Sequence, residues 1–193
     1  YHKLGTIKAE SGDYSQAIND FNKAIELNPN NDYAYFRRGL IKLNLKDYIG
    51  ALEDSNMAIR NNQGGLPESN LYSSPTDLYK FRSYYSYYSL RGIVKGKLGN
   101  HEEAVDDLKK SIRIKGNSTM FRDYDSSDKS RSYGFDYIHL GLNLVELGKY
   151  NYGCALIKEG IGLGFKDGEE LLKNNYCNNV TTPDVMDWSF DSF

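Results

Sequence analysis

Apolar side chains recur at helical spacing from the first residues of the chain. Leu4 and Ile7 share one helical face with the small Gly5, and a second apolar stripe comprises Ala17, Ile18, Phe21, Ala24, Ile25 and Leu27. Gly12 lies between the two stripes, and glycine commonly ends a helix. Asn28-Pro29 closes the second stripe, because proline cannot continue a helix. The pattern therefore predicts two helices joined by a tight turn within residues 1–31.

The same order of small residues returns at a fixed interval. Three of them have counterparts 34 residues later, in the pairs Gly5 and Gly39, Ala17 and Ala51, and Ala24 and Ala58. In a third copy, Gly92 and Ala104 lie 53 residues after Gly39 and Ala51, and in a fourth, Gly141 lies 49 residues after Gly92. A repeat of this length predicts a solenoid of stacked helical hairpins.

The two longer intervals locate insertions of 19 and 15 residues, within 61–80 and 116–131. Ser74-Pro75-Thr76-Asp77 combines a capping residue, a proline at the first helical position and an acid, so it predicts a long helix that ends near Leu98. Ser126-Ser127-Asp128 predicts a second long helix that ends near Leu147. The alternative is that both insertions are surface loops.

These residues and their spacing resemble the tetratricopeptide repeat family, from Tyr1 to about Phe165. The resemblance implies an all-α, right-handed superhelical solenoid of about four helical hairpins with a C-terminal capping helix. In that family, small residues let the helices approach closely and a proline makes the turn between hairpins. The matching positions here are Gly5, Ala17, Ala24, Pro29, Gly39, Ala51, Ala58, Gly92, Ala104 and Gly141.

The spacing also sets the expected boundaries. We expect one repeat domain at 1–177, with repeats at about 1–31, 32–62, 81–115 and 132–165, a closing helix at 169–176 and an aromatic, acidic tail at 178–193. Ser55 stands where the family has an aromatic residue, and in the fourth repeat Gly153 and Gly160 replace the two alanines. Glycine costs about 1 kcal/mol relative to alanine in a helix, so we expect the fourth hairpin to be looser. We expect the tail, with Trp188, to dock on the last repeats.

The charge balance narrows the range of partners. The 193 residues carry a formal net charge of -2, which argues against a general surface for nucleic acid or anionic membranes. No apolar run approaches the roughly 18 residues that span a bilayer, so we expect no membrane span. Tyr1 corresponds to a position inside the first helix of a repeat, so we expect the array to begin upstream of it. The compartment stays unknown, with the cytoplasm slightly favoured.

The chain has two cysteines, Cys154 and Cys177, which are too few for a disulfide framework. We expect two separate, partly buried thiols. The alternative is a bridge between the fourth repeat and the closing helix.

The residues with catalytic potential form no recognisable site, so we expect no enzyme activity, no metal and no cofactor. His101 stands where other repeats have tyrosine, and His2 and His139 lie in different repeats without a metal-binding motif. Gly160-Ile161-Gly162-Leu163-Gly164 resembles a phosphate loop in composition, but it ends a helix and follows no strand.

The family resemblance implies that the first helix of each hairpin lines a concave, partner-binding groove. The positions that map to it are Tyr33, Phe36, Arg37, Leu40, Leu90, Ile93, Ile138 and His139. The alternative is that several of these pack inside the solenoid. One subfamily clamps the C-terminal carboxylate of heat-shock chaperones with Lys, Asn and Arg, and the corresponding residues here are His2, Thr6, Arg37, Ser86 and Leu90. Four of the five cannot make that clamp, so we exclude that partner class.

The sequence therefore predicts a non-catalytic scaffold for a protein or peptide partner. Residues 80–88 interleave aromatic and basic side chains, a pattern that can stack on single-stranded nucleic acid. Tyrosines at this density more often line a helix–helix or protein interface, so a nucleic-acid partner is disfavoured. Two alternatives stay open: a self-assembly module that forms homo-oligomers, and a regulatory segment of a larger protein.

Overall fold

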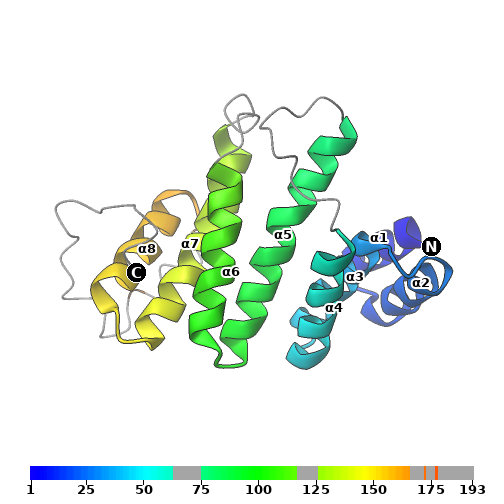
Figure 1. The fold of residues 1–193 in the computed structure, drawn as a ribbon, viewed down its shortest axis with the longest axis horizontal. Coiled ribbons are helices and arrows are strands. Elements are labelled where there is room, and N and C mark those ends of the chain that lie inside the picture. The colour runs from blue at the N-terminus through cyan, green and yellow to red at the C-terminus, as the bar shows by residue number, and fades with distance from the viewer. Residues whose placement is uncertain (63–74, 117–125, 166–171, 173–176, 178–193) are drawn as a thin grey trace. The chain divides into compact units, whose positions relative to one another are not determined.

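The computed structural model describes residues 1–62, 75–116, 126–165, Leu172 and Cys177, and in these residues it contains α-helices and no β-strand (Figure 1). The helices are α1 (His2–Glu10), α2 (Tyr14–Leu27), α3 (Asp32–Asn44), α4 (Tyr48–Asn61), α5 (Pro75–Lys97), α6 (His101–Gly116), α7 (Ser126–Glu146) and α8 (Tyr150–Gly162). The chain divides into two compact units, Tyr1–Leu98 and Gly99–Phe193. The expected all-α class is confirmed.

Both long helices begin where their start signals stand. Helix α5 runs for 23 residues from Pro75, and α7 runs for 21 residues from Ser126. The C-terminal parts of both insertions are therefore helical extensions rather than loops. The predicted closing helix lies outside the described residues except for Leu172, and the tail at 178–193 lies wholly outside them.

A residue in the left-handed backbone region makes the turn inside each hairpin. Gly12, Lys46, Gly99 and Gly148 occupy the same repeat position and have φ values of 84°, 63°, 84° and 75°. This conformation brings the next amide back onto the preceding helix, as in the 2.9 Å bond from the Asp47 N–H to the Lys42 carbonyl. Asp13 and Asp47 then cap α2 and α4 by accepting bonds from the amides of Gln16 and Gly50.

Small residues set the contacts in the first unit. A Cβ atom on Gly5 would lie 3.1 Å from the Phe21 ring. Phe21 also packs with Ile41 of α3 in a cluster whose buried members are Ala17, Phe21, Ala24, Ala34 and Ile41. The expected aromatic position holds Ser55, which is fully buried and donates a 2.8 Å bond to the Leu52 carbonyl.

The fourth hairpin is packed more closely than the sequence suggested. A Cβ atom on Gly141 of α7 would lie 2.5 Å from the Gly153 carbonyl oxygen of α8, and one on Gly160 would lie 2.6 Å from the Gly134 carbonyl oxygen. Two glycine pairs thus let the two backbones touch. The expectation of a looser hairpin, which counted only the helix propensity of glycine, was wrong about the packing.

The favoured reading of the two cysteines as separate thiols was also wrong. Cys154 in α8 forms a disulfide with Cys177, and the two Cα atoms are 5.4 Å apart. Both cysteines are buried, in a cluster with Ile157 and the partly buried Leu172. The bridge ties the region after α8 back onto that helix.

We expect Gly141→Ala to destabilise the second unit by about 2 kcal/mol, because the added methyl group would meet the backbone of α8. The denaturation midpoint in urea, followed by circular dichroism, measures this loss. Gly162→Ala is the matched control, since a Cβ atom there has nothing within 4 Å. Equal midpoints for the two variants would contradict the close-packing account.

We expect Lys46→Gly to stabilise the first unit by about 0.5–1 kcal/mol, because Lys46 has a φ of 63° and glycine adopts this region without steric cost. Thermal unfolding measures the gain. Lys46→Ala removes the same side-chain charge but keeps the Cβ atom, so its melting temperature should stay near that of the wild type. A matching gain in the alanine variant would assign the effect to charge instead.

Candidate protein-binding surface

Aromatic and charged side chains of α1 and α3 gather on one face of the first unit. The His2 and Tyr33 rings meet edge to face with centroids 6.1 Å apart. The Arg37 guanidinium lies 5.9 Å from the centre of the Tyr33 ring and 3.8 Å from a carboxylate oxygen of Glu10. Arg37 is partly buried and Glu10 is exposed, so this ion pair is open to solvent and weak.

Phe36 and Leu40 lie on the border between this face and the core. The Phe36 ring is 5.0 Å from the ring of the fully buried Tyr87 in α5. Leu40 packs against a core cluster that includes Leu90. Each side chain is partly exposed, so each retains apolar area that a ligand can cover.

Three of the predicted groove residues are buried. Leu90 and Ile93 of α5 are 2% and 5% exposed, and Ile138 of α7 is 2% exposed. Leu90 fills the space left by Gly39, where a Cβ atom would lie 3.2 Å from its side chain. These three side chains are core residues and offer little area to a ligand.

The eighth predicted residue, His139, lies in the second unit and is partly exposed. Its ring meets the Phe135 ring edge to face at 4.6 Å, and Phe135 in turn meets Phe165 at 5.2 Å. This group lies in the second unit, whereas the face of α1 and α3 lies in the first.

Residues 80–88 were expected to line an interface or the core, and three of the four tyrosines described among them are buried. Tyr85, Tyr87 and Tyr88 are each less than a tenth exposed, and Tyr88 meets the partly exposed Tyr84 edge to face at 5.1 Å. The three buried rings are not available to stack on nucleic-acid bases.

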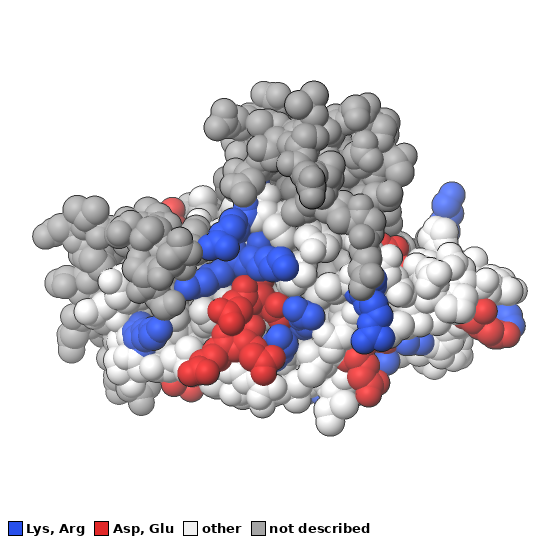
Figure 2. All heavy atoms as spheres, viewed as in Figure 1, with Lys and Arg blue, Asp and Glu red and all other residues white. Residues whose placement is uncertain are grey.

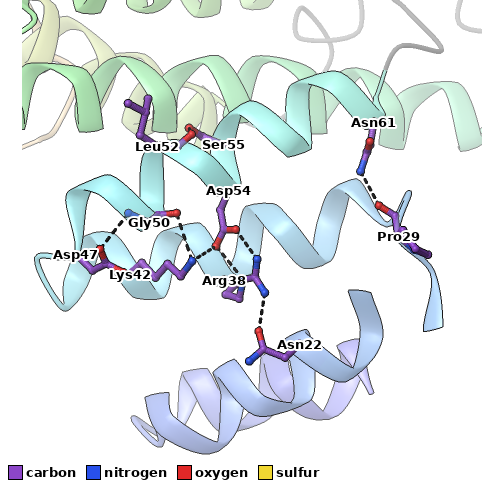
Figure 3. A network of polar contacts seen from close by, with 10 residues as sticks. All are labelled: Asn22, Pro29, Arg38, Lys42, Asp47, Gly50, Leu52, Asp54, Ser55 and Asn61. Carbon is purple, nitrogen blue, oxygen red and sulfur yellow. Dashed lines mark hydrogen bonds and ion pairs between the residues drawn. The ribbon is translucent and has the colours of Figure 1, made fainter. Parts of the chain in front are cut away.

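A buried polar network holds α3 in register beside the candidate surface (Figure 3). Asp54 of α4 accepts two bonds from Arg38, at 2.6 and 2.9 Å, and lies 3.0 Å from the Lys42 ammonium. Arg38 also donates to Asn22 of α2 at 2.5 Å. One arginine thereby links the second helices of two successive repeats.

The same polar contacts recur at repeat spacing. Arg91, which corresponds to Arg38, donates to Asn56, the counterpart of Asn22, at 3.1 Å. Lys8 lies 2.7 Å from Asp20 in the first repeat, as Lys42 does from Asp54 in the second. Sequence reasoning missed this network, although the 34-residue spacing of its lysines and aspartates is visible in the sequence.

Two effects of opposite sign act on the pKa of Arg38. Burial lowers the pKa of the guanidinium, but the hydrogen bonds and charge of Asp54 outweigh that effect, so the pKa rises above its ordinary value. Arg38 therefore stays charged, and its own deprotonation does not break its pairing with Asp54.

The second unit contains its own buried ion pair. The Lys115 ammonium of α6 and the Ser111 hydroxyl each lie 2.6 Å from one Asp136 oxygen of α7. Lys115 also lies 5.7 Å from the centre of the Tyr133 ring. Burial, followed by the charges of Glu159 and Asp136, raises the pKa of the nearby Tyr137. This pair fixes α7 on α6.

Charge is segregated along α6. Its first turn carries Glu102 and Glu103, and its last turn carries Arg113 and Lys115. Figure 2 shows an acidic patch next to a basic one at the place of α6. Acids near the start and bases near the end of a helix complement its dipole, so the pattern stabilises α6 without pointing to a ligand.

The described residues contain no group of three or more His, Cys, Asp or Glu side chains that could hold a metal ion. Across the same part of the chain, none of the helices has the length and apolar character needed to cross a membrane.

Comparison with known families matches the two regions where the repeat pattern is clearest. Residues 5–46 match the family described as TPR repeat, and residues 85–118 match the family described as Tetratricopeptide repeat. The chain contains tetratricopeptide repeats in these two regions. No curated protein matches the sequence. Tetratricopeptide repeats are an architecture for protein interaction, so the functional class is that of an interaction scaffold.

Solved structures agree on the fold. A crystal structure of MamA has 17% sequence identity and a TM-score of 0.59, over 87% of this chain and 80% of that one. A structure described as MamA RS-1 ArsTM double mutant has 19% identity and a TM-score of 0.58, over 86% and 74% of the two chains. At such identities the likeness supports the tetratricopeptide solenoid alone.

We expect Asp54→Asn to destabilise the first unit by about 3 kcal/mol, because Arg38 and Lys42 lose a buried counter-charge. Urea denaturation measures the loss. Glu53→Gln also replaces a carboxylate by an amide, but on an exposed neighbour. It should alter stability by less than about 0.5 kcal/mol. An Asp54 variant as stable as this control would show that the network is dispensable.

Proposed function

We propose that this chain is a non-catalytic scaffold whose first unit binds a protein or peptide segment on the face of α1 and α3. Tyr33, Phe36, Arg37 and Leu40 supply the contacts, together with His2. Leu90 belongs to the core cluster against which Phe36 and Leu40 pack, and His139 belongs to a separate group in the second unit. The proposal needs neither metal nor cofactor.

The geometry of Arg37 is the observation that carries the proposal. Its guanidinium is held beside the Tyr33 ring, with exposed Glu10 as a distant counter-ion. A cation already restrained by an aromatic ring loses less side-chain freedom when a ligand binds. A ligand carboxylate can form a bidentate pair with Arg37 that the 3.8 Å contact with Glu10 does not provide.

The neighbouring residues suggest the class of ligand. His2, Tyr33 and Phe36 place aromatic rings on the same two helices as Arg37. Aromatic residues with arginine are typical of binding hot spots. We therefore propose a segment with a carboxylate flanked by apolar side chains.

A selection from random peptides displayed on phage, with the wild-type chain as bait, supplies a defined probe for this surface. We expect the selected peptides to contain acidic residues and to bind Arg37→Ala at least about tenfold more weakly, a loss of ~1.4 kcal/mol. Isothermal calorimetry measures the affinities, and circular dichroism confirms that the variant is folded.

Arg60→Ala is the matched control, because Arg60 is an exposed arginine on α4, away from the proposed surface. It should bind the peptides with wild-type affinity. Peptides that bind Arg37→Ala and Phe36→Ala as tightly as the wild type would contradict the assignment of this face.

A further inference from the structure

The turn between α3 and α4 departs from the other three hairpin turns at two positions. Glycine occupies the left-handed position of the other turns, but Lys46 occupies it here, with a φ of 63°. A lysine in this backbone region carries a steric cost that glycine avoids. Three residues later, where the other repeats have Ser, Glu and Asn, this repeat has Ile49. A strained lysine and an apolar residue at a polar position together suggest that both side chains are used in a contact.

Two large aliphatic side chains at this turn are open to solvent. Leu45, which follows α3, is 53% exposed, and Ile49, in the first turn of α4, is 67% exposed. Ile49 begins a stripe of exposed residues that continues along α4 with Glu53, Asn56 and Arg60. Removing this apolar area from water is favourable, so the two side chains can form the centre of a contact.

Opposite charges lie on either side of Ile49 along the chain. Lys46 precedes it by three residues, and Glu53 follows it by four, one turn further along α4. Glu53 contributes to the electrostatic field at Arg38, but neither Glu53 nor Lys46 forms an ion pair or a hydrogen bond within the described residues. Asp47, the acid next to Lys46, accepts a 3.0 Å bond from the Gly50 amide and caps α4 (Figure 3). Lys46 and Glu53 can therefore each pair with a group outside the chain.

We propose that this edge, formed by Leu45, Lys46, Ile49 and Glu53, binds the same edge of a second copy of this chain around a two-fold axis at Ile49. The two α4 helices then start in opposite directions, and the aliphatic side chains of each copy cover those of the other. Lys46 of each copy faces Glu53 of the other, so the ion pair forms twice. A two-fold contact requires a surface that is complementary to itself, and an apolar centre between a base and an acid meets that requirement.

The charges favour a second copy over an anionic membrane. Glu53 and Asp47 flank the aliphatic side chains and would be repelled by acidic lipid headgroups, whereas Glu53 has a partner in the two-fold arrangement. The edge shares no residue with the proposed ligand-binding face, so the two proposals stand independently. The contact is small, so we expect a dimer that dissociates on dilution.

Sedimentation equilibrium tests the association at concentrations up to about 1 mM, where a dimer with a millimolar Kd is detectable. We expect the average mass of the wild type to rise from 22.0 kDa toward twice that value. Ile49→Glu should raise the Kd at least about tenfold, because it places two carboxylates at the two-fold axis. Leu27→Glu is the matched control, since Leu27 is 65% exposed at the end of α2, and it should associate like the wild type.

A wild type that stays at 22.0 kDa throughout would overturn the proposal, also if it binds anionic vesicles through Ile49. Association that is unchanged in Ile49→Glu, or lost equally in Leu27→Glu, would overturn the assignment to this edge. Circular dichroism confirms that each variant is folded.

Exchange of the two charges tests the pairing itself. Lys46→Glu leaves two acids on the edge and Glu53→Lys leaves two bases, so each variant alone should stay monomeric. An equal mixture of the two should form dimers, because each acid of one variant then faces a base of the other. The combined variant Lys46→Glu/Glu53→Lys should also associate by itself. Failure of both combinations to recover association would overturn the pairing.

Lys46→Gly separates a contact role from a structural one. It should raise the melting temperature, because glycine relieves the left-handed backbone, and yet weaken the association, because the base is lost. A variant that is more stable and associates as strongly as the wild type would overturn the role of Lys46 in the contact.

Discussion

The short distance between paired helices is the constraint on which the rest of this structure depends. The helices can lie this close because small residues stand at the contact points. Each of these residues leaves room for a side chain or a backbone segment of the neighbouring helix. Gly5 accommodates the Phe21 ring, Gly39 accommodates Leu90, and Gly141 accommodates the backbone of α8. Once this distance is set, the turn and the stacking of the next hairpin follow.

Polar contacts then determine the register that packing alone leaves open. Apolar surfaces tolerate sliding because they are not directional, whereas the bidentate bond between Arg38 and Asp54 permits one alignment of α3 and α4. The same arginine contacts Asn22, so the register extends to α2. A candidate binding face built on α1 and α3 is thereby held on a rigid frame, which keeps Arg37 in place beside Tyr33.

The repeat pattern predicted the fold well because helical spacing, turn glycines and capping acids are local signals. Long helices starting at Pro75 and Ser126 could be read from a few residues each. The candidate site was less predictable, since burial depends on neighbours distant in sequence. Leu90 and Ile93 share repeat positions with the partly exposed Arg37 and Leu40 but lie in the core, as Ile138 does. The close glycine packing was missed, and the disulfide was only the alternative, for the same reason, because propensity and residue counts carry no information about which backbones meet.

The disulfide gives Cys177 a second covalent link to α8, besides the main chain. It joins residues 23 positions apart, so a protease that cuts between them leaves both fragments attached through sulfur. Cys177 would stay seated beside Ile157 after such a cut. Cleavage of the polypeptide between the two cysteines therefore does not by itself release Cys177 from α8.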